Sequence, residues 1–153
     1  MIDDGPETRE RLTTALHVAR WVDEVAAGCP YPSLDALVGV ADLAARGLTP
    51  AEVDEALSAH PRIGEKTAGL SSAEQAASAT EDPKLVEAMV VGNQTYEQRF
   101  GRIFLIRAAG RSRLEVLAEL HRRLGLSDDE EAAEVADQLR QIALLRLQTL
   151  FAS

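Results

Sequence analysis

The chain has 153 residues, of which 46% are hydrophobic and 4% aromatic, and it carries a formal net charge of -9 at pH 7. This length suits one domain with its own hydrophobic core, whereas the negative charge disfavours nucleic acid and anionic membranes as partners. The single cysteine excludes an internal disulfide. We see no usual signal peptide, no apolar run of bilayer length and no C-terminal Ser-Lys-Leu peroxisomal signal, so we expect a cytoplasmic protein.

The first part of the chain repeats apolar residues at helical spacing. Residues 8–27 carry such a stripe up to a Gly-Cys-Pro-Tyr-Pro break, and they predict one helix. Ser33 is a good N-cap for a second helix, which should run toward Gly47. Thr49-Pro50-Ala51-Glu52 is a capping box with proline at the first helical position, and its helix should end near Ala59.

The second part of the chain repeats the same start signal. Capping boxes begin at Ser71, Ser112 and Ser127, each with glutamate three residues later. An Asp-Pro pair should open a helix over 82–100 that a glycine then ends, and a long last helix should cover 127–150. Helix starts of this kind indicate an all-α protein.

Residues 102–109 do not fit a helix clearly. They form a short apolar run rich in β-formers and bounded by glycines. Extended backbone in a helical protein would leave N–H and C=O groups outside any helix ladder, where a ligand could use them. We see no internal repeat or linker. We therefore predict an all-α, single-domain compact bundle of about seven to eight helices, with a short extended or irregular segment near 102–109.

A loop motif, His60-Pro61-Arg62-Ile63-Gly64-Glu65-Lys66, is the most informative stretch for function. Histidine transfers protons near neutral pH, and Pro61 disfavours the α region at His60, so the imidazole should stand at a helix end. The alternative is an ordinary helix-end histidine. His17 and His121 fit structural or solvated positions, and the histidine spacing matches no metal-ligand pattern, so we expect no metal site.

Three further side chains each allow a functional and a plain interpretation. Glu74, at the N3 position of the capping box that begins at Ser71, either satisfies the helix start or binds a small polar heterocycle there. Gln75 offers an amide that suits a urea or lactam edge, or is an ordinary exposed residue. Arg146, amid leucines, either pairs with a carboxylate or covers apolar surface with its stem. The acidic run 128–131 reads as a solvated helix N-terminus.

Four motifs in order carry a family resemblance. They are His60-Pro61-Arg62-Ile63-Gly64-Glu65, Ser71-x-x-Glu74-Gln75, Asn93-x-x-Tyr96-x-x-x-Phe100-Gly101-x-x-Phe104 and Ile142-x-x-x-Arg146-Leu147. Together they resemble the OHCU decarboxylases, which act on 2-oxo-4-hydroxy-4-carboxy-5-ureidoimidazoline in urate breakdown, and the resemblance runs from about Arg20 to Phe151. It implies an all-α fold, a homodimer, no cofactor and one such domain over residues 1–153, with residues 1–7 the stretch most open to disorder.

The resemblance also implies a role for each matching position. His60 would donate a proton, and Glu74 would be the catalytic carboxylate. The substrate-binding positions would be Pro61, Ser71, Gln75, Phe104, Leu105, Ile106, Arg107, Ala108 and Arg146. The implied reaction is cofactor-free decarboxylation of the small-molecule ureidoimidazoline to (S)-allantoin in purine catabolism. The main alternative is a non-catalytic helical ligand-binding or protein-interaction module. The next is a catalytically retired relative that binds purine-derived ligands, and the third is a lyase or hydrolase on another ureido heterocycle.

Overall fold

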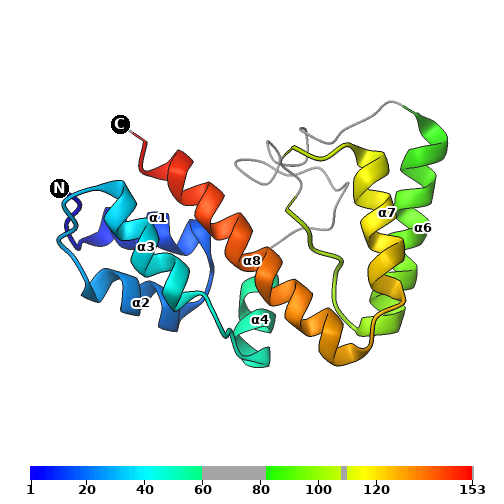
Figure 1. Ribbon diagram of the computed structural model, residues 1–153, viewed down its shortest axis with the longest axis horizontal. Coiled ribbons are helices and arrows are strands. Elements are labelled where there is room, and N and C mark those ends of the chain that lie inside the picture. The colour runs from blue at the N-terminus through cyan, green and yellow to red at the C-terminus, as the bar shows by residue number, and fades with distance from the viewer. Residues whose placement is uncertain (60–81, 108–109, 153) are drawn as a thin grey trace. The chain divides into compact units, whose positions relative to one another are not determined.

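The computed structural model describes residues 1–59, 82–107 and 110–152 (Figure 1). In these ranges the chain forms seven α-helices and no β-strand, apart from an isolated antiparallel bridge between Ile2 and Tyr31. The predicted all-α class is confirmed, and residues 102–107 are irregular, as expected. The helix start predicted at Ser71 lies outside the described residues. The helices are α1 (Pro6–Ala15), α2 (Ala19–Ala27), α3 (Leu34–Ala44), α4 (Pro50–Leu57), α6 (Pro83–Phe100), α7 (Arg113–Leu124) and α8 (Asp128–Leu150).

Contacts group the described residues into two compact units. The first unit combines residues 1–59 and 136–152, and so contains α1 to α4 and the later part of α8. The second unit covers the described residues from 82 to 135, and so contains α6, α7 and the first turns of α8. None of the helices in the described ranges is long and apolar enough to cross a bilayer.

The prediction of one helix over 8–27 is wrong, because α1 and α2 are separate helices. Leu16 and Val18 have extended backbone, which ends α1 and begins α2. Neither glycine nor proline marks this break; instead, the Ala19 N–H at the start of α2 donates to the Glu55 carboxylate of α4 at 2.9 Å. The stripe itself is buried as predicted, at Leu12, Leu16, Val18, Trp21, Val22 and Val25.

The predicted helix starts of the first unit are confirmed. The Ser33 hydroxyl accepts a hydrogen bond from the Ala36 N–H at the start of α3. Thr49 forms both hydrogen bonds of a capping box with Glu52 at the start of α4. Each cap satisfies N–H groups that have no partner within the helix, which is why these short motifs fix where a helix begins.

Glu52 also joins α4 to α2 through an ion pair. The Arg20 Nε lies 2.7 Å from a Glu52 carboxylate oxygen, and the Thr49 N–H donates to the other oxygen at 3.0 Å. The Arg20 hydrogen bond, together with the Thr49 backbone, lowers the pKa of Glu52 to about 2. A carboxyl group with a lowered pKa in the folded state stabilises the fold above its ordinary pKa of 4.5, and this stabilisation is lost as the pH falls through 2.

We therefore expect Glu52→Gln to lower the free energy of unfolding by about 1–2 kcal/mol at pH 7, a value reduced for the solvent exposure of Arg20. Near pH 2 the variant and the wild type should differ little, and chemical denaturation at the two pH values measures this. Glu24→Gln is the control, because Glu24 pairs with the same Arg20 at an exposed i,i+4 position but caps no helix. An equal loss for Glu52→Gln at both pH values would contradict the expectation.

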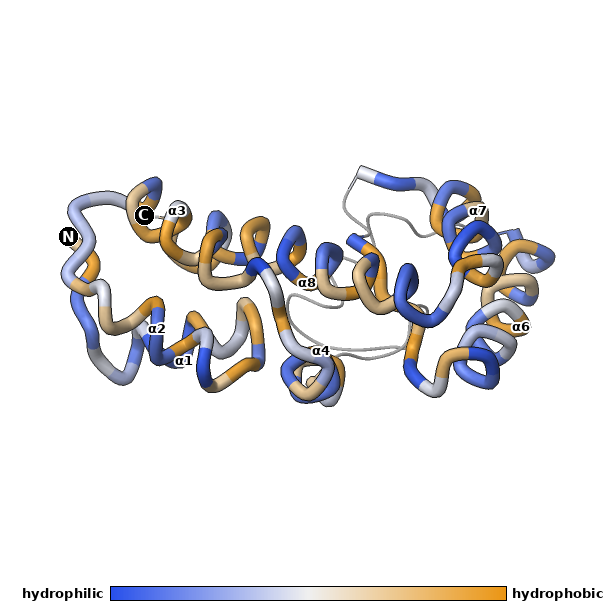
Figure 2. Tube along the Cα trace, turned by 60° about the horizontal axis from the view of Figure 1, so that its bottom comes forward, coloured by the Kyte–Doolittle hydropathy of each residue, from blue (hydrophilic) through white to orange (hydrophobic). Residues whose placement is uncertain are grey.

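The second unit is built on α6 and α7, which lie side by side (Figure 1). Hydrophobic residues recur along both helices between hydrophilic ones (Figure 2). Gly92 allows the close approach, because a Cβ there would lie 3.1 Å from a methyl carbon of Leu120. The buried core cluster of this unit is Met89, Tyr96, Phe104, Ile106, Val116, Leu117 and Leu120.

The helix ends of the second unit follow the predicted signals. Asp82 caps α6, and Gly101 ends it in the left-handed region with φ of 72°. Ser112 forms a capping box at the start of α7, and Ser127 does so with Glu130 at the start of α8. The left-handed glycine stops the helix and begins the irregular segment 102–107.

Candidate active site

The described ranges contain part of the predicted site. Arg146 lies in the first unit, on α8, and residues 104–107 lie in the second unit. His60, Pro61, Ser71, Glu74, Gln75 and Ala108 lie outside the described residues.

The segment 104–107 uses its carbonyl groups for its own support. The Leu105 carbonyl accepts a hydrogen bond from Arg123 at 2.5 Å, and the Arg107 carbonyl accepts one from Arg111 at 2.9 Å. Phe104, Leu105 and Ile106 are buried. None of the described residues accepts a hydrogen bond from the backbone N–H of these three residues. In the described part of the chain, the segment thus keeps amide donors that a ligand with carbonyl oxygens could use.

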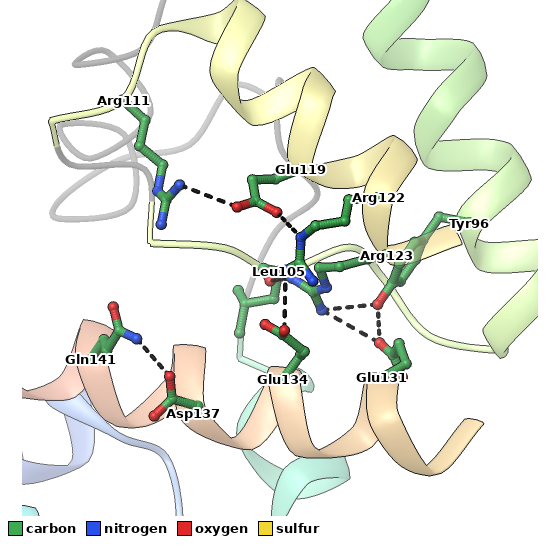
Figure 3. A network of polar contacts seen from close by, with 10 residues as sticks. All are labelled: Tyr96, Leu105, Arg111, Glu119, Arg122, Arg123, Glu131, Glu134, Asp137 and Gln141. Atoms are coloured by element: carbon green, nitrogen blue, oxygen red, sulfur yellow. Dashed lines mark hydrogen bonds and ion pairs between the residues drawn. The ribbon is translucent and has the colours of Figure 1, made fainter. Parts of the chain in front are cut away.

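A buried polar network supports this segment, and we call Tyr96, Arg123 and Glu131 the Arg123 network (Figure 3). The guanidinium of Arg123 donates to the Tyr96 hydroxyl at 2.9 Å and lies 3.4 Å from a Glu131 carboxylate oxygen. The Tyr96 hydroxyl in turn donates to Glu131. The same guanidinium lies over the Phe104 ring, 4.9 Å from its centroid. Arg123 thus contacts segment 104–107 through both a backbone carbonyl and a ring.

Burial governs the electrostatics of the Arg123 network. Arg123 is 1% exposed and Glu131 is 0% exposed. Removal from water lowers the pKa of Arg123 to about 10 and raises the pKa of Glu131 to about 7. The prediction that 128–131 is a solvated helix start is therefore wrong at Glu131, which turns inward to Arg123 and to the Arg102 guanidinium, 3.4 Å away.

No sequence motif indicated Arg123 or Glu131 as site residues. Arg123 carried a usable signal, because Val116, Leu120 and Arg123 share one face of α7 and are all buried. Glu131 carried none, because it stands in an acidic run whose other members suit a helix N-terminus. Tyr96 belonged to the family motif but was assigned no role.

Arg146 is 7% exposed, although it is charged. Its Nη1 donates to the Thr14 carbonyl in the last turn of α1 at 3.0 Å. The structure therefore does not match the interpretation in which the aliphatic part of Arg146 covers apolar surface while its guanidinium stays in water. One of its donors thus has a backbone carbonyl as partner, whereas the sequence suggested a carboxylate.

A cavity of about 310 Å³ in the first unit contains none of the predicted site residues. It lies where the predicted helix over 8–27 breaks, and the exposed His17 borders it. Its lining residues are Arg9, Thr13, His17, Val18, Ala19, Val22, Asp23 and Glu55. Within the described ranges, no group of three His, Cys, Asp or Glu side chains could hold a metal ion.

Comparison with known proteins decides the family. The sequence model of the OHCU decarboxylases matches residues 4–148, almost the whole chain. This chain belongs to the OHCU decarboxylase family. A 2-oxo-4-hydroxy-4-carboxy-5-ureidoimidazoline decarboxylase of Haloferax volcanii is 30% identical to it over 138 residues, which cover 87% of this chain and 82% of that protein.

Solved structures show the same OHCU decarboxylase fold. A crystal structure of an OHCU decarboxylase in the presence of (S)-allantoin matches with a TM-score of 0.83 at 24% identity, covering 97% of this chain and 100% of that one. A crystal structure of (S)-allantoin synthase matches with a TM-score of 0.68 at 18% identity, covering 95% of this chain and 51% of that one. The family and the fold class predicted from the motifs are confirmed.

Proposed function

We propose that this protein catalyses the cofactor-free decarboxylation of 2-oxo-4-hydroxy-4-carboxy-5-ureidoimidazoline to (S)-allantoin. The observation that carries the proposal is the family match over residues 4–148, with 30% identity to the Haloferax volcanii decarboxylase. Segment 104–107 supports it, because a ring with urea and lactam carbonyls requires hydrogen-bond donors in a buried place.

The chemistry of this substrate explains why amino-acid side chains suffice. The carboxylate stands on a ring carbon that also bears a hydroxyl group, next to an imine carbon that bears the ureido group. When the C–C bond to the carboxylate breaks, CO2 leaves, the electron pair forms a double bond to the ureido carbon, and the imine nitrogen takes up a proton, which gives an enol intermediate. The hydroxyl then becomes a carbonyl, and the ureido carbon takes up a proton. Delivery of that proton to one face sets the S configuration.

We assign the roles as the family motifs imply. His60 delivers the proton, and Glu74 orients the imidazole or accepts the hydroxyl proton. Arg146 holds an anionic oxygen of the substrate. The remaining contacts to the ring and the ureido group come from Pro61, Ser71, Gln75, Phe104, Leu105, Ile106, Arg107 and Ala108.

The biological setting completes the proposal. We propose that residues 1–153 act as one catalytic domain, that the enzyme is a cytoplasmic homodimer, and that it works in purine catabolism. The family resemblance supports these points, and the net charge of -9 agrees with a small-molecule substrate rather than nucleic acid. Light scattering of the purified protein measures the oligomeric state directly.

The deciding experiment follows the chirality of the product. The substrate decays spontaneously to racemic allantoin, so product formation alone proves nothing. With freshly generated substrate, we expect the protein to produce a circular dichroism signal of (S)-allantoin at a rate proportional to its concentration. Racemic product at the uncatalysed rate would contradict the proposed function and favour the non-catalytic module.

Arg146 offers a second test of the proposed site. Lysine keeps the charge but loses the planar fork of donors, so we expect Arg146→Lys to lower kcat/KM about 10- to 100-fold. Steady-state rates of (S)-allantoin formation measure this. Arg140→Lys is the matched control, because Arg140 lies on the same helix and pairs with Asp42 and Asp137 of the first unit. Equal kcat/KM values for the two variants would remove Arg146 from the site.

A further inference from the structure

Arg123 occupies a buried position that would suit an apolar side chain. Burial there removes water from the charged guanidinium, a cost that an apolar side chain would not have. Arg123 continues the buried face of α7 after Val116 and Leu120, and only 1% of its surface is exposed. A buried guanidinium is costly, and hydrogen bonds and ion pairs offset that cost; the Nη1 and Nη2 of Arg123 have such partners, whereas its Nε has none among the described residues. Two of the contacts of Arg123, with the Phe104 ring and the Leu105 carbonyl, lie in one short stretch, and the others are with Tyr96 and Glu131.

The hold on Leu105 also determines the direction of the next amide. In a trans peptide the C=O of one residue and the N–H of the next lie in one plane and point in opposite directions. The peptide between Leu105 and Ile106 is trans, since the chain's one cis bond in the described ranges is Cys29–Pro30. Because the Leu105 oxygen points to Arg123, the Ile106 N–H points away from the Arg123 network.

The Ile106 N–H then requires an acceptor of its own. Ile106 is buried, and a buried N–H group without a partner is strongly unfavourable. Among the described residues no group accepts its hydrogen bond. On the proposed function, this residue belongs to the segment that contacts the substrate, whose urea and lactam carbonyls are acceptors of the right kind.

We propose that Arg123 is a positioning residue for substrate binding: by holding the Leu105 carbonyl, it aims the Ile106 N–H at a carbonyl oxygen of the ureidoimidazoline. Tyr96 and Glu131 hold the guanidinium in turn, since the tyrosine hydroxyl accepts from Arg123 and donates to the carboxylate. The inference rests on the proposed function. It adds to that function a specificity element from α7, outside the family motifs.

The test separates substrate binding from folding. Arg123→Lys keeps the charge but cannot span the Leu105 carbonyl, Tyr96 and Glu131 with one planar fork. We expect KM for the ureidoimidazoline to rise roughly fivefold to tenfold, with kcat within about twofold, because the lost hydrogen bond serves substrate and transition state alike. A merely structural role would instead lower the amount of active enzyme, and so the apparent kcat, at unchanged KM.

Two matched variants sharpen this result. Tyr96→Phe removes only the hydroxyl between Arg123 and Glu131 and keeps the ring packing, so a rise in KM of about twofold to threefold is expected even if Arg123→Lys fails to fold. Arg122→Lys is the control, because this neighbour on α7 is 47% exposed and pairs with Glu119 and Glu134. It should leave KM unchanged.

A direct measurement uses the wild-type protein labelled with 15N. Titration with (S)-allantoin should move the Ile106 amide proton downfield. A silent Ile106 amide at saturation, or folded Arg123→Lys and Tyr96→Phe variants with wild-type KM, would overturn the inference while an active wild type upholds the proposed function. A wild type that forms no (S)-allantoin would overturn both.

Discussion

His60→Asn should lower the rate of (S)-allantoin formation by about 10²- to 10⁴-fold, the usual contribution of a general acid or base. Asparagine is similar in size and keeps hydrogen bonding, but it has no group that exchanges a proton near neutral pH. The fold should stay intact, because the substitution preserves the polar character of a residue just beyond α4. The initial rate of the circular dichroism signal on freshly generated substrate measures the effect.

His121→Asn provides the matched control for this experiment. His121 is an exposed residue of α7, and its replacement should leave the rate within about twofold of the wild type. A His60→Asn protein with wild-type turnover would defeat the assignment of the proton donor. It would leave the family membership untouched, because that depends on the whole of residues 4–148.

Local rules account for the part of the fold that the sequence predicted well. A capping box places its hydroxyl and its carboxylate within four residues, so Thr49, Ser112 and Ser127 determine their helix starts without help from distant parts of the chain. Gly101 ends α6 for the same local reason, since the left-handed region favours glycine. Such signals can be recognised in the sequence because the two partners of each hydrogen bond are only a few residues apart.

Long-range contacts account for the features that the sequence did not predict. The stripe over 8–27 buries the expected side chains, yet the chain bends at Leu16 and Val18, where a glutamate of α4 caps α2. Glu131 looks like its acidic neighbours, and only its arginine and tyrosine partners turn it into a core residue. Within the candidate site, the sequence indicated that segment 104–107 is irregular. It did not indicate that Arg123 supports this segment.

Glu131→Met should destabilise the second unit by about 3–5 kcal/mol, because it leaves the buried Arg123 guanidinium without its carboxylate. Methionine fits a helix and approximates the length of glutamate, so the loss reports on charge more than on volume. Adding Arg123→Met should recover much of the loss, since a buried pair replaced by apolar side chains is often no less stable. Chemical denaturation followed by far-UV circular dichroism gives the free energies of unfolding.

Two probes show in which unit Glu131→Met lowers stability. Trp21, the one tryptophan of the sequence, lies in the first unit, so its fluorescence should report little change. Amide hydrogen exchange in α7 should accelerate, because the buried face of this helix includes Arg123. Glu134→Met is the control, since Glu134 pairs at the surface with Arg122 and should matter by about 1 kcal/mol or less. If Glu131→Met and Glu134→Met were equally mild, the Arg123 network would contribute no stability, and Arg123 would hold Leu105 without needing a charged partner.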